Sequence, residues 1–233
     1  ALVLRMWAMD PLPGVRVTVI NPGPAAPYTG MLPGLIAGHY ARDEIMIDLV
    51  RLARFAGARV ILDRVTGIDR SARVVHLANR PPLAFDIASI DIGIASDLPA
   101  LPGFAVHATA AKPLGAYAES WQAFVARALP KPNVVVIGAG IGGVELALAS
   151  RHRLGPLATI TLLEQAEAPL GGVGAATRRA LLAHLTRAQI PVLTQAAPAR
   201  ITADAVVLGV ARMNAVLETD YDNRFIRVQS GRT

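Results

Sequence analysis

The chain has 233 residues, of which 53% are hydrophobic and 17% charged, and its formal net charge is +6. This length is enough for one large domain or two modest ones, each with its own hydrophobic core. The composition excludes a disordered chain and favours an α/β protein whose strands are buried on both faces. Gly, Pro, Asp or Arg interrupts each apolar run before it reaches the ~18–20 residues that a membrane-spanning helix requires.

The basic residues and the absence of cysteine narrow the classes of function. Of the 23 basic residues only Lys112 and Lys131 are lysines, and the arginines are dispersed along a chain that contains only 5% aromatic residues. This pattern argues against a nucleic-acid partner. Without Cys, the 233 residues cannot form a disulfide, a thiolate metal site or a redox-active dithiol. The five His show no metal-ligand spacing, and we predict no metal site.

The first half of the chain predicts helices alternating with short strands. Residues 1–9 have the pattern of a helix that lacks a cap and a preceding strand, and we therefore expect further residues upstream. The next expected elements are a strand at 15–20, a Pro/Gly-rich loop at 21–38, and a helix at 43–56 whose apolar face contains Ile45, Leu49, Leu52 and Phe55. β-type runs then predict a small antiparallel meander, with strands at 59–62, 65–68, 73–77 and 87–94.

The second half predicts a βαβ nucleotide-binding module of about a hundred residues. A linker at 99–113 and a helix at 114–129 precede it. Its expected elements are strands at 134–137 and 159–163, helices at 141–154 and 175–188, and further strands at 191–193 and 205–208.

A glycine-rich turn stands between the first strand and the first helix of this module. Residues 138–143, GAGIGG, match the dinucleotide-binding pattern G-x-G-x-x-G, and Ala139, Ile141 and Gly142 fill its variable positions. Gly138 permits the tight turn, Gly140 removes the Cβ that would block a pyrophosphate, and Gly143 allows helix and strand to approach. The phosphates would meet the positive end of the helix dipole.

Glu164 lies 21 residues beyond Gly143, at the end of the next predicted strand. A carboxylate there accepts hydrogen bonds from the adenosine ribose and repels a 2′-phosphate, so we predict NADH in preference to NADPH. The alternative is that the glycines only tighten a turn and that Glu164 is a surface acid. Glu145 is expected to point inward from the first helical turn, where it would need either a basic partner or a bound nicotinamide and flavin.

The run at 134–147, VVVIGAGIGGVELA, resembles the second dinucleotide fingerprint of two-dinucleotide-binding-domain flavoproteins, the pyridine nucleotide-disulfide oxidoreductase superfamily. The loop at 27–40 resembles that of its type II NADH dehydrogenase-like branch. Closest is the oxidoreductase domain fused to selenide, water dikinase, to which Lys112-Pro113 and the runs at 145–149 and 151–153 are similar.

The resemblance implies an α/β fold with two Rossmann-like dinucleotide-binding domains, one for FAD and one for NAD(H), and a small antiparallel β-meander. The expected layout is an FAD domain at 1–111 that lacks its N-terminal strand, an NAD(H) domain at 112–214, and a return segment of the FAD domain at 215–233. Asn21 stands where an acid usually binds the FAD ribose. The residues that the resemblance places at the FAD are Asn21, Tyr28, Thr29, Gly30, Arg64, Val65, Ile92 and Gly93, while Glu145 would face the nicotinamide and the flavin.

The resulting hypothesis is an FAD-dependent oxidoreductase that takes a hydride from NADH. Since the chain lacks a dithiol, electrons would pass to a quinone-like small molecule or to a redox protein. The alternative is a non-catalytic nucleotide-sensing or docking module associated with selenophosphate synthesis. Without a secretion signal we expect a cytoplasmic protein, and the sequence leaves open a homodimer and peripheral contact with the inner face of the membrane.

Overall fold

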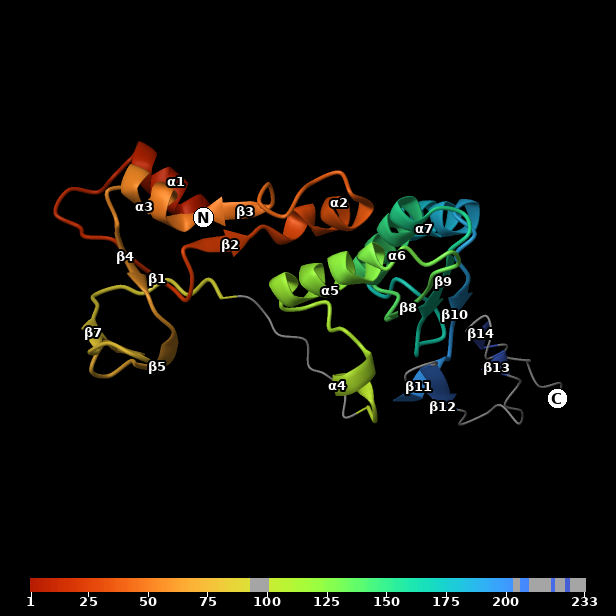
Figure 1. Cartoon of the computed structure of the whole chain (residues 1–233). Coiled ribbons are helices and arrows are strands. Elements are labelled where there is room, and N and C mark those ends of the chain that lie inside the picture. Colours follow the sequence, from red (N-terminus) through yellow and green to blue (C-terminus); the bar gives the residue numbers. More distant parts are fainter. Residues whose placement is uncertain (93–100, 203–205, 210–218, 221–224, 227–233) are drawn as a thin grey trace. The chain divides into compact units, whose positions relative to one another are not determined.

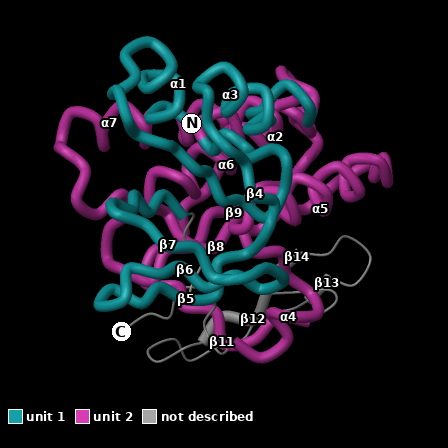
Figure 2. Tube along the Cα trace, turned by 90° about the vertical axis from the view of Figure 1, so that its left-hand side faces the viewer, with its two compact units in different colours: residues 1–29, 42–93 teal, residues 30–41, 94–233 magenta. Residues whose placement is uncertain are grey.

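The computed structural model describes residues 1–92, 101–202, 206–209, 219–220 and 225–226 of the chain (Figure 1). It is a mixed α/β structure that contains both parallel and antiparallel strand pairs. The contacts divide it into two compact units (Figure 2), one formed by residues 1–29 and 42–93 and the other by residues 30–41 and 94–233. Within the described ranges, none of the helices has the length and apolarity of a membrane-spanning segment.

The first unit contains a parallel strand pair, an antiparallel pair and a three-stranded antiparallel sheet. β1 (Thr18–Asn21) pairs in parallel with β4 (Arg59–Leu62). β2 (Ala25–Pro27) pairs with β3 (Met46–Asp48), and β6 (Val74–Leu77) lies between β5 (Val65–Asp69) and β7 (Leu83–Ala84). Its helices, α1 (Leu2–Met9) and α3 (Leu49–Phe55), contact each other. The predicted antiparallel meander is therefore present.

The second unit is built around a parallel sheet in the order β10–β9–β8. The chain runs from β8 (Asn133–Ile137) through α6 (Ile141–Leu154) into β9 (Thr159–Leu163), and through α7 (Ala175–Arg187) into β10 (Val192–Leu193). This is the βαβαβ connectivity of a Rossmann half. The remaining elements are α2 (Leu32–Ala37), α4 (Phe104–His107), α5 (Leu114–Ala126), β11 (Ala197–Ile201), β12 (Val206–Gly209), β13 (Thr219–Asp220) and β14 (Phe225–Ile226), and η1 (Thr29–Met31) precedes α2.

A close-packed core joins α6 and α7 to this sheet. Val144 and Ala147 on α6, Ile160 and Leu162 on β9, and Leu185 on α7 are at most 1% exposed. Burial of apolar side chains at this depth is the main favourable term in folding, at roughly 25 cal/mol per Å². The core therefore holds the start of α6 against the sheet, where the glycine-rich turn lies.

Two segments of the first half differ from the sequence-based expectation. The helix expected at 43–56 begins only at Leu49, because the Asp48 side chain caps it by accepting a hydrogen bond from the Arg51 N–H at 2.9 Å. Residues 46–48 form a strand instead, and Phe55, expected on the apolar face, is 67% exposed. The expected loop at 21–38 contains β2 and the buried helix α2, whose early Pro33 is tolerated because the first helical N–H groups need no intrahelical partner.

The strands of the predicted meander also need correction. Residues 59–62 pair with β1 in parallel and do not join the meander. The third meander strand is β7, whereas residues 87–92 form no strand and residues 93–94 lie outside the described ranges. The short strand β11 was not predicted, and the linker expected at 99–113 contains α4. The pairing of β4 with the distant strand β1 is decided by tertiary contacts, which local patterns do not encode.

Candidate nucleotide-binding site

The glycine-rich turn connects β8 directly to α6, at the carboxyl end of the parallel sheet. Gly138 has φ +102°, a backbone conformation that side-chain-bearing residues rarely adopt, and its N–H donates to the Leu163 carbonyl at 2.8 Å. Gly140 is the N-cap of α6, with φ −72° and ψ −179°. The turn is therefore formed by residue types that fit its backbone, as the sequence predicted.

The space around Gly143 is crowded, whereas the space around Gly140 is open. A Cβ at Gly143 would lie 1.9 Å from the Gly138 carbonyl oxygen, so only glycine allows α6 to approach the turn this closely. A Cβ at Gly140 or Gly142 would meet no atom of the described residues within 4 Å. Close packing explains the glycine at Gly143, whereas packing among the residues that the structure describes gives no reason for glycine at Gly140. The open space there fits a phosphate group that approaches the backbone.

The start of α6 has the electrostatic character of an anion site. Its first turn contains no acidic residue, and its N-cap, Gly140, has no side chain that could accept hydrogen bonds from the first N–H groups. The first N–H groups of a helix have no intrahelical acceptor and lie at the positive end of the helix dipole. The last turn contains Arg151, His152 and Arg153, which complement the negative end. The exposed start of α6 can therefore stabilise a pyrophosphate without a lysine.

Glu164 is part of the turn's own hydrogen-bond network. Its Oε2 accepts from the Ala139 N–H at 3.0 Å, and its Oε1 accepts from the Ala166 N–H at 2.9 Å. The Ala139 carbonyl in turn accepts from the Leu170 N–H at 2.9 Å. A carboxylate has about four lone-pair sites, so Glu164 can still accept from two ribose hydroxyl groups. The structure thus brings the predicted ribose ligand to the predicted phosphate turn.

Glu145 does not occupy the inward position expected from the sequence. Its side chain is exposed, whereas Val144 before it and Leu146 after it are buried. The expectation of a buried carboxylate that needs a partner is therefore wrong, because α6 buries the neighbouring positions instead. Ile141, the first residue of α6, is 51% exposed.

The residues expected at the FAD lie in separate parts of the fold. Asn21 ends β1, and Arg64 and Val65 follow β4, the adjacent strand. Tyr28, which is 53% exposed, and Thr29 follow β2. Gly30 is grouped with the second unit. Ile92 is 82% exposed, and Gly93 lies outside the described residues.

Asp63 is a residue in this region that sequence reasoning missed. It is only 5% exposed, and its carboxylate accepts hydrogen bonds from Arg64 and Asn79. The available signal was an acid placed directly after the apolar strand run at 60–62. Among the described residues, no group of three or more His, Asp or Glu has the geometry to hold a metal ion.

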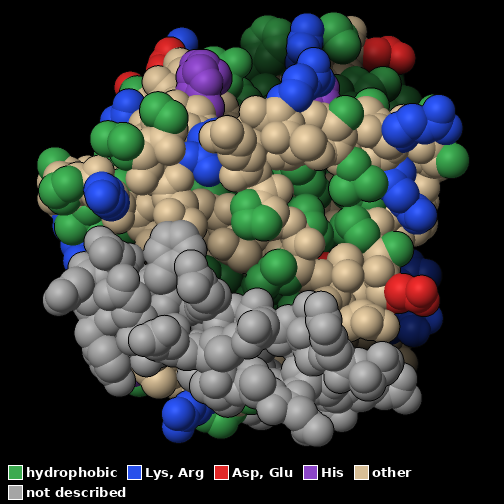
Figure 3. All heavy atoms as spheres, turned by 90° about the vertical axis from the view of Figure 1, so that its right-hand side faces the viewer, with side chains coloured by type: hydrophobic (Ala, Val, Ile, Leu, Met, Phe, Trp, Pro, Cys, Tyr) green, Lys and Arg blue, Asp and Glu red, His purple; other side chains and the backbone are tan. Residues whose placement is uncertain are grey.

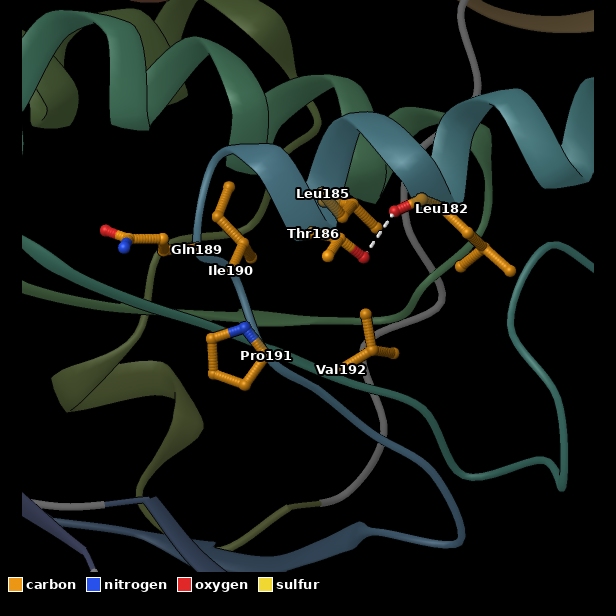
Figure 4. Close-up of a pocket in the computed structure, with 7 residues that line it drawn as sticks. All are labelled: Leu182, Leu185, Thr186, Gln189, Ile190, Pro191 and Val192. Carbon is orange, nitrogen blue, oxygen red and sulfur yellow. Dashed lines mark hydrogen bonds between the residues drawn. The ribbon is translucent and has the colours of Figure 1, made fainter.

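An apolar hollow of about 620 Å³ lies elsewhere in the second unit (Figure 4). Its lining comes from the end of α7 and the start of β10 and consists of Leu182, Leu185, Thr186, Gln189, Ile190, Pro191 and Val192. The Gln189 carbonyl accepts from Arg151 in the last turn of α6, so the hollow is near the end of α6 that is remote from the glycine-rich turn. On the face shown in Figure 3, Lys and Arg side chains lie in separate small groups.

Comparison with known proteins identifies the family of this chain. The family model described as "Pyridine nucleotide-disulphide oxidoreductase" matches residues 2–231. The chain belongs to this family. No curated protein sequence matches the chain.

Solved structures of the same fold include reduced CoADR-RHD of Bacillus anthracis, with a TM-score of 0.75 and 16% identity over 89% of this chain and 39% of that chain. NDH2 of Plasmodium falciparum in complex with NADH has a TM-score of 0.67 and 16% identity, over 81% of this chain and 44% of that chain. Sulfide:quinone oxidoreductase of Aquifex aeolicus has a TM-score of 0.69 and 18% identity, over 88% of this chain and 51% of that chain. This family member thus spans about 39–51% of the length of these relatives.

Proposed function

We propose that this family member functions as an FAD-dependent oxidoreductase that accepts a hydride from NADH. The observation that carries the proposal is the open space at Gly140, beside the start of α6. Glu164 stabilises the same turn by accepting a hydrogen bond from the Ala139 N–H. These groups fit the pyrophosphate and ribose of NADH. The NAD(H) site in this proposal consists of Gly138, Gly140, Ile141, Gly142, Gly143, Glu145 and Glu164.

The domain layout follows from the same proposal. Residues 1–111 would belong to an FAD domain, residues 112–214 to the NAD(H) domain, and residues 215–233 to the segment that returns to the FAD domain. Asn21 and Arg64 support the FAD assignment, because they lie at the carboxyl ends of the parallel strands β1 and β4, where open α/β sheets bind ligands. Tyr28, Thr29, Gly30, Val65, Ile92 and Gly93 complete the FAD assignment.

In the mechanism, bound FAD would supply the two-electron chemistry that accepts the hydride. The protein contributes alignment: the turn at 138–143 holds the pyrophosphate, and Glu164 holds the adenosine ribose. Glu145 is exposed on the first turns of α6, where it can contact the nicotinamide half of the nucleotide. Since these 233 residues contain no Cys, electrons would leave for a non-dithiol acceptor, either a quinone-like molecule or a redox protein.

The finer assignments are part of the proposal. The loop at 27–40 favours the type II NADH dehydrogenase-like branch, and the runs at 145–149 and 151–153 favour the oxidoreductase domain fused to selenide, water dikinase. A cytoplasmic protein with peripheral contact at the inner membrane face fits an acceptor of the quinone type. Once NADH oxidation is observed, the identity of the electron acceptor and the binding of the protein to membranes are the first properties to measure.

Gly140→Val tests the nucleotide site in the full-length protein. The φ and ψ angles of Gly140 are accessible to valine, and a Cβ there meets no atom of the described part of the chain within 4 Å, so the variant should fold. We expect its affinity for NADH to fall by ~100-fold or more, because the side chain fills the space of the pyrophosphate. Gly115→Val is the matched control, since Gly115 on α5 also faces open space. Unchanged NADH affinity in folded Gly140→Val would refute the site.

Absorption spectra of the purified full-length protein test the redox function. Flavin bands that bleach on addition of NADH are the expected result. A protein that binds NADH without reduction of a flavin would instead support the alternative of a nucleotide-sensing module. Stopped-flow mixing measures the rate of bleaching and separates the two outcomes.

A further inference from the structure

Asp63 is a buried carboxylate for which the proposed mechanism has no role. It follows β4 directly, and its main-chain N–H donates to the Asn21 carbonyl at 3.1 Å, which continues the pairing of β4 with β1. The carboxyl ends of these two parallel strands therefore lie at one edge. Ligands of open α/β sheets bind in the crevice outside this edge. Asp63 is thus placed at the edge of the first unit that the proposal assigns to FAD.

The carboxylate of Asp63 faces the protein's own loops. Its Oδ1 accepts from the Arg64 N–H at 2.7 Å and from Asn79 Nδ2 at 3.0 Å, and its Oδ2 accepts from the Asn79 N–H at 3.0 Å. These three bonds use most of its about four lone-pair sites. Asp63 is therefore poorly suited to bind a ribose itself, and it instead connects the β4–β5 turn to the residues that follow β6.

The peptide groups of Arg64 are held from both sides. Its N–H donates to Asp63, and its carbonyl accepts from the Ala78 N–H at 2.9 Å. The side chains of Arg64 and Val65 remain exposed, with Val65 at 41%. A fixed backbone thus presents two exposed side chains close to the edge of the β1–β4 pair.

Asp63 is ionised at neutral pH. Burial acts to raise the pKa of this carboxyl, but the hydrogen bonds from Arg64 and Asn79 and the charge of Arg80 outweigh burial and place the pKa below its ordinary value. Hydrogen bonds to an ionised acceptor are stronger than those between neutral groups. The ionised carboxylate therefore strengthens the hydrogen bonds that join Arg64 and Asn79.

We propose that Asp63 is a positioning residue for the adenosine half of FAD, because it fixes the main chain at Arg64 and Val65 next to Asn21, where the proposed function places the ribose of FAD. The inference depends on the proposed function, since it requires FAD to bind the first unit. Substitution of a residue that only stabilised the fold would lower the affinity for all ligands together with the melting temperature. Substitution of a positioning residue lowers the affinity only for ligands that contain the half of the cofactor contacted by its loop.

The test compares Asp63→Asn with Asp69→Asn in the full-length protein stripped of flavin. Asp69 is an exposed carboxylate of the same unit that also accepts a main-chain hydrogen bond, from the Ala72 N–H at 2.8 Å, but it lies at the far end of β5. In the Asp63→Asn variant the amide keeps one acceptor oxygen and replaces the other with an NH₂ donor, so the turn loosens without loss of the strands. The measurements are dissociation constants for FAD, FMN and NAD⁺, together with the melting temperature.

We expect Asp63→Asn to weaken FAD binding by ~10-fold or more, and to leave FMN and NAD⁺ binding within ~2-fold of wild type. Asp69→Asn should change none of the three constants. Wild-type affinity for FAD in the folded Asp63→Asn variant, or an equal loss for FAD and FMN, would overturn the inference. If Asp63→Asn fails to fold, Asn79→Ala is the second variant, because it removes only the side-chain donor and should selectively weaken FAD binding, by ~3-fold.

A wild-type protein that binds no FAD would overturn the proposed function as well as the inference. This outcome distinguishes a failure of the proposed function from a failure of the inference alone.

Discussion

Gly143→Ala should destabilise the second unit, although alanine is the better helix former. The new Cβ would lie 1.9 Å from the Gly138 carbonyl oxygen and 3.0 Å from its carbon, and real Cβ contacts are at least 3.0 Å. The obstructing atoms belong to the backbone, so no side chain can rotate away. The first turn of α6 would have to move, together with Val144, which is fully buried in the core that α6 shares with β9.

The size of the effect follows from two opposing terms. Overpacking a close-packed region costs about 1–3 kcal/mol, and a backbone obstruction places the cost at or above the upper end. The exchange of glycine for alanine in a helix contributes about 1 kcal/mol of stability. We expect a net loss of about 2 kcal/mol, which lowers the melting temperature of a domain of ~150–250 residues by ~4–8 °C.

Thermal unfolding followed by circular dichroism measures this loss. Gly115→Ala is the matched control, because it introduces the same methyl group in the first turn of α5, where the described residues place no atom within 4 Å of the new Cβ. Its melting temperature should equal or exceed that of the wild type. If Gly143→Ala also melted at or above the wild-type temperature, the close approach of α6 to the turn would not be real.

Three further predictions use the hydrogen bonds of both units. Glu164→Ala removes the acceptor of the buried Ala139 N–H and should cost about 1–3 kcal/mol in thermal melts, whereas Glu164→Gln should retain most of the stability and narrow the preference for NADH over NADPH in binding titrations. Arg151→Met removes donors to four carbonyls beyond the end of α6 and should cost about 1.5–3 kcal/mol in chemical unfolding, whereas Arg179→Met, at an exposed position, should cost less than about 0.5 kcal/mol. Because the pKa of Asp63 is lowered in the folded state, its contribution to folding stability is present at neutral pH and is lost as the pH falls below about 4. Asp63→Asn should therefore flatten the acid side of a plot of melting temperature against pH. An unchanged slope in this variant would contradict the link between the Asp63 pKa and stability.

Local patterns in the sequence were sufficient for the segment from β8 to β10. The bounds of α6 and β9 agree with the predicted ranges 141–154 and 159–163, and α7 ends one residue before the predicted 188. Apolar strands, a helical period and a glycine-rich turn are properties of consecutive residues, so the chain encodes them without reference to tertiary contacts. The positive φ of Gly138 and the crowding at Gly143 supply the physical reason for that turn.

Tertiary contacts decided the features that join residues far apart in the sequence. Which surfaces pack together decides the exposure of Glu145 and the start of α3 after a strand. It also decides the burial of α2, whose Ile36 carbonyl accepts a hydrogen bond from Trp121 at 3.1 Å. The same holds for the carboxylates: Glu164 reaches Ala139 across 25 positions, and Asp63 reaches Asn79 across 16. A sequence shows that such a residue can accept hydrogen bonds, but only the folded chain determines which donors lie within reach, because hydrogen bonds form over about 3 Å and not along the chain.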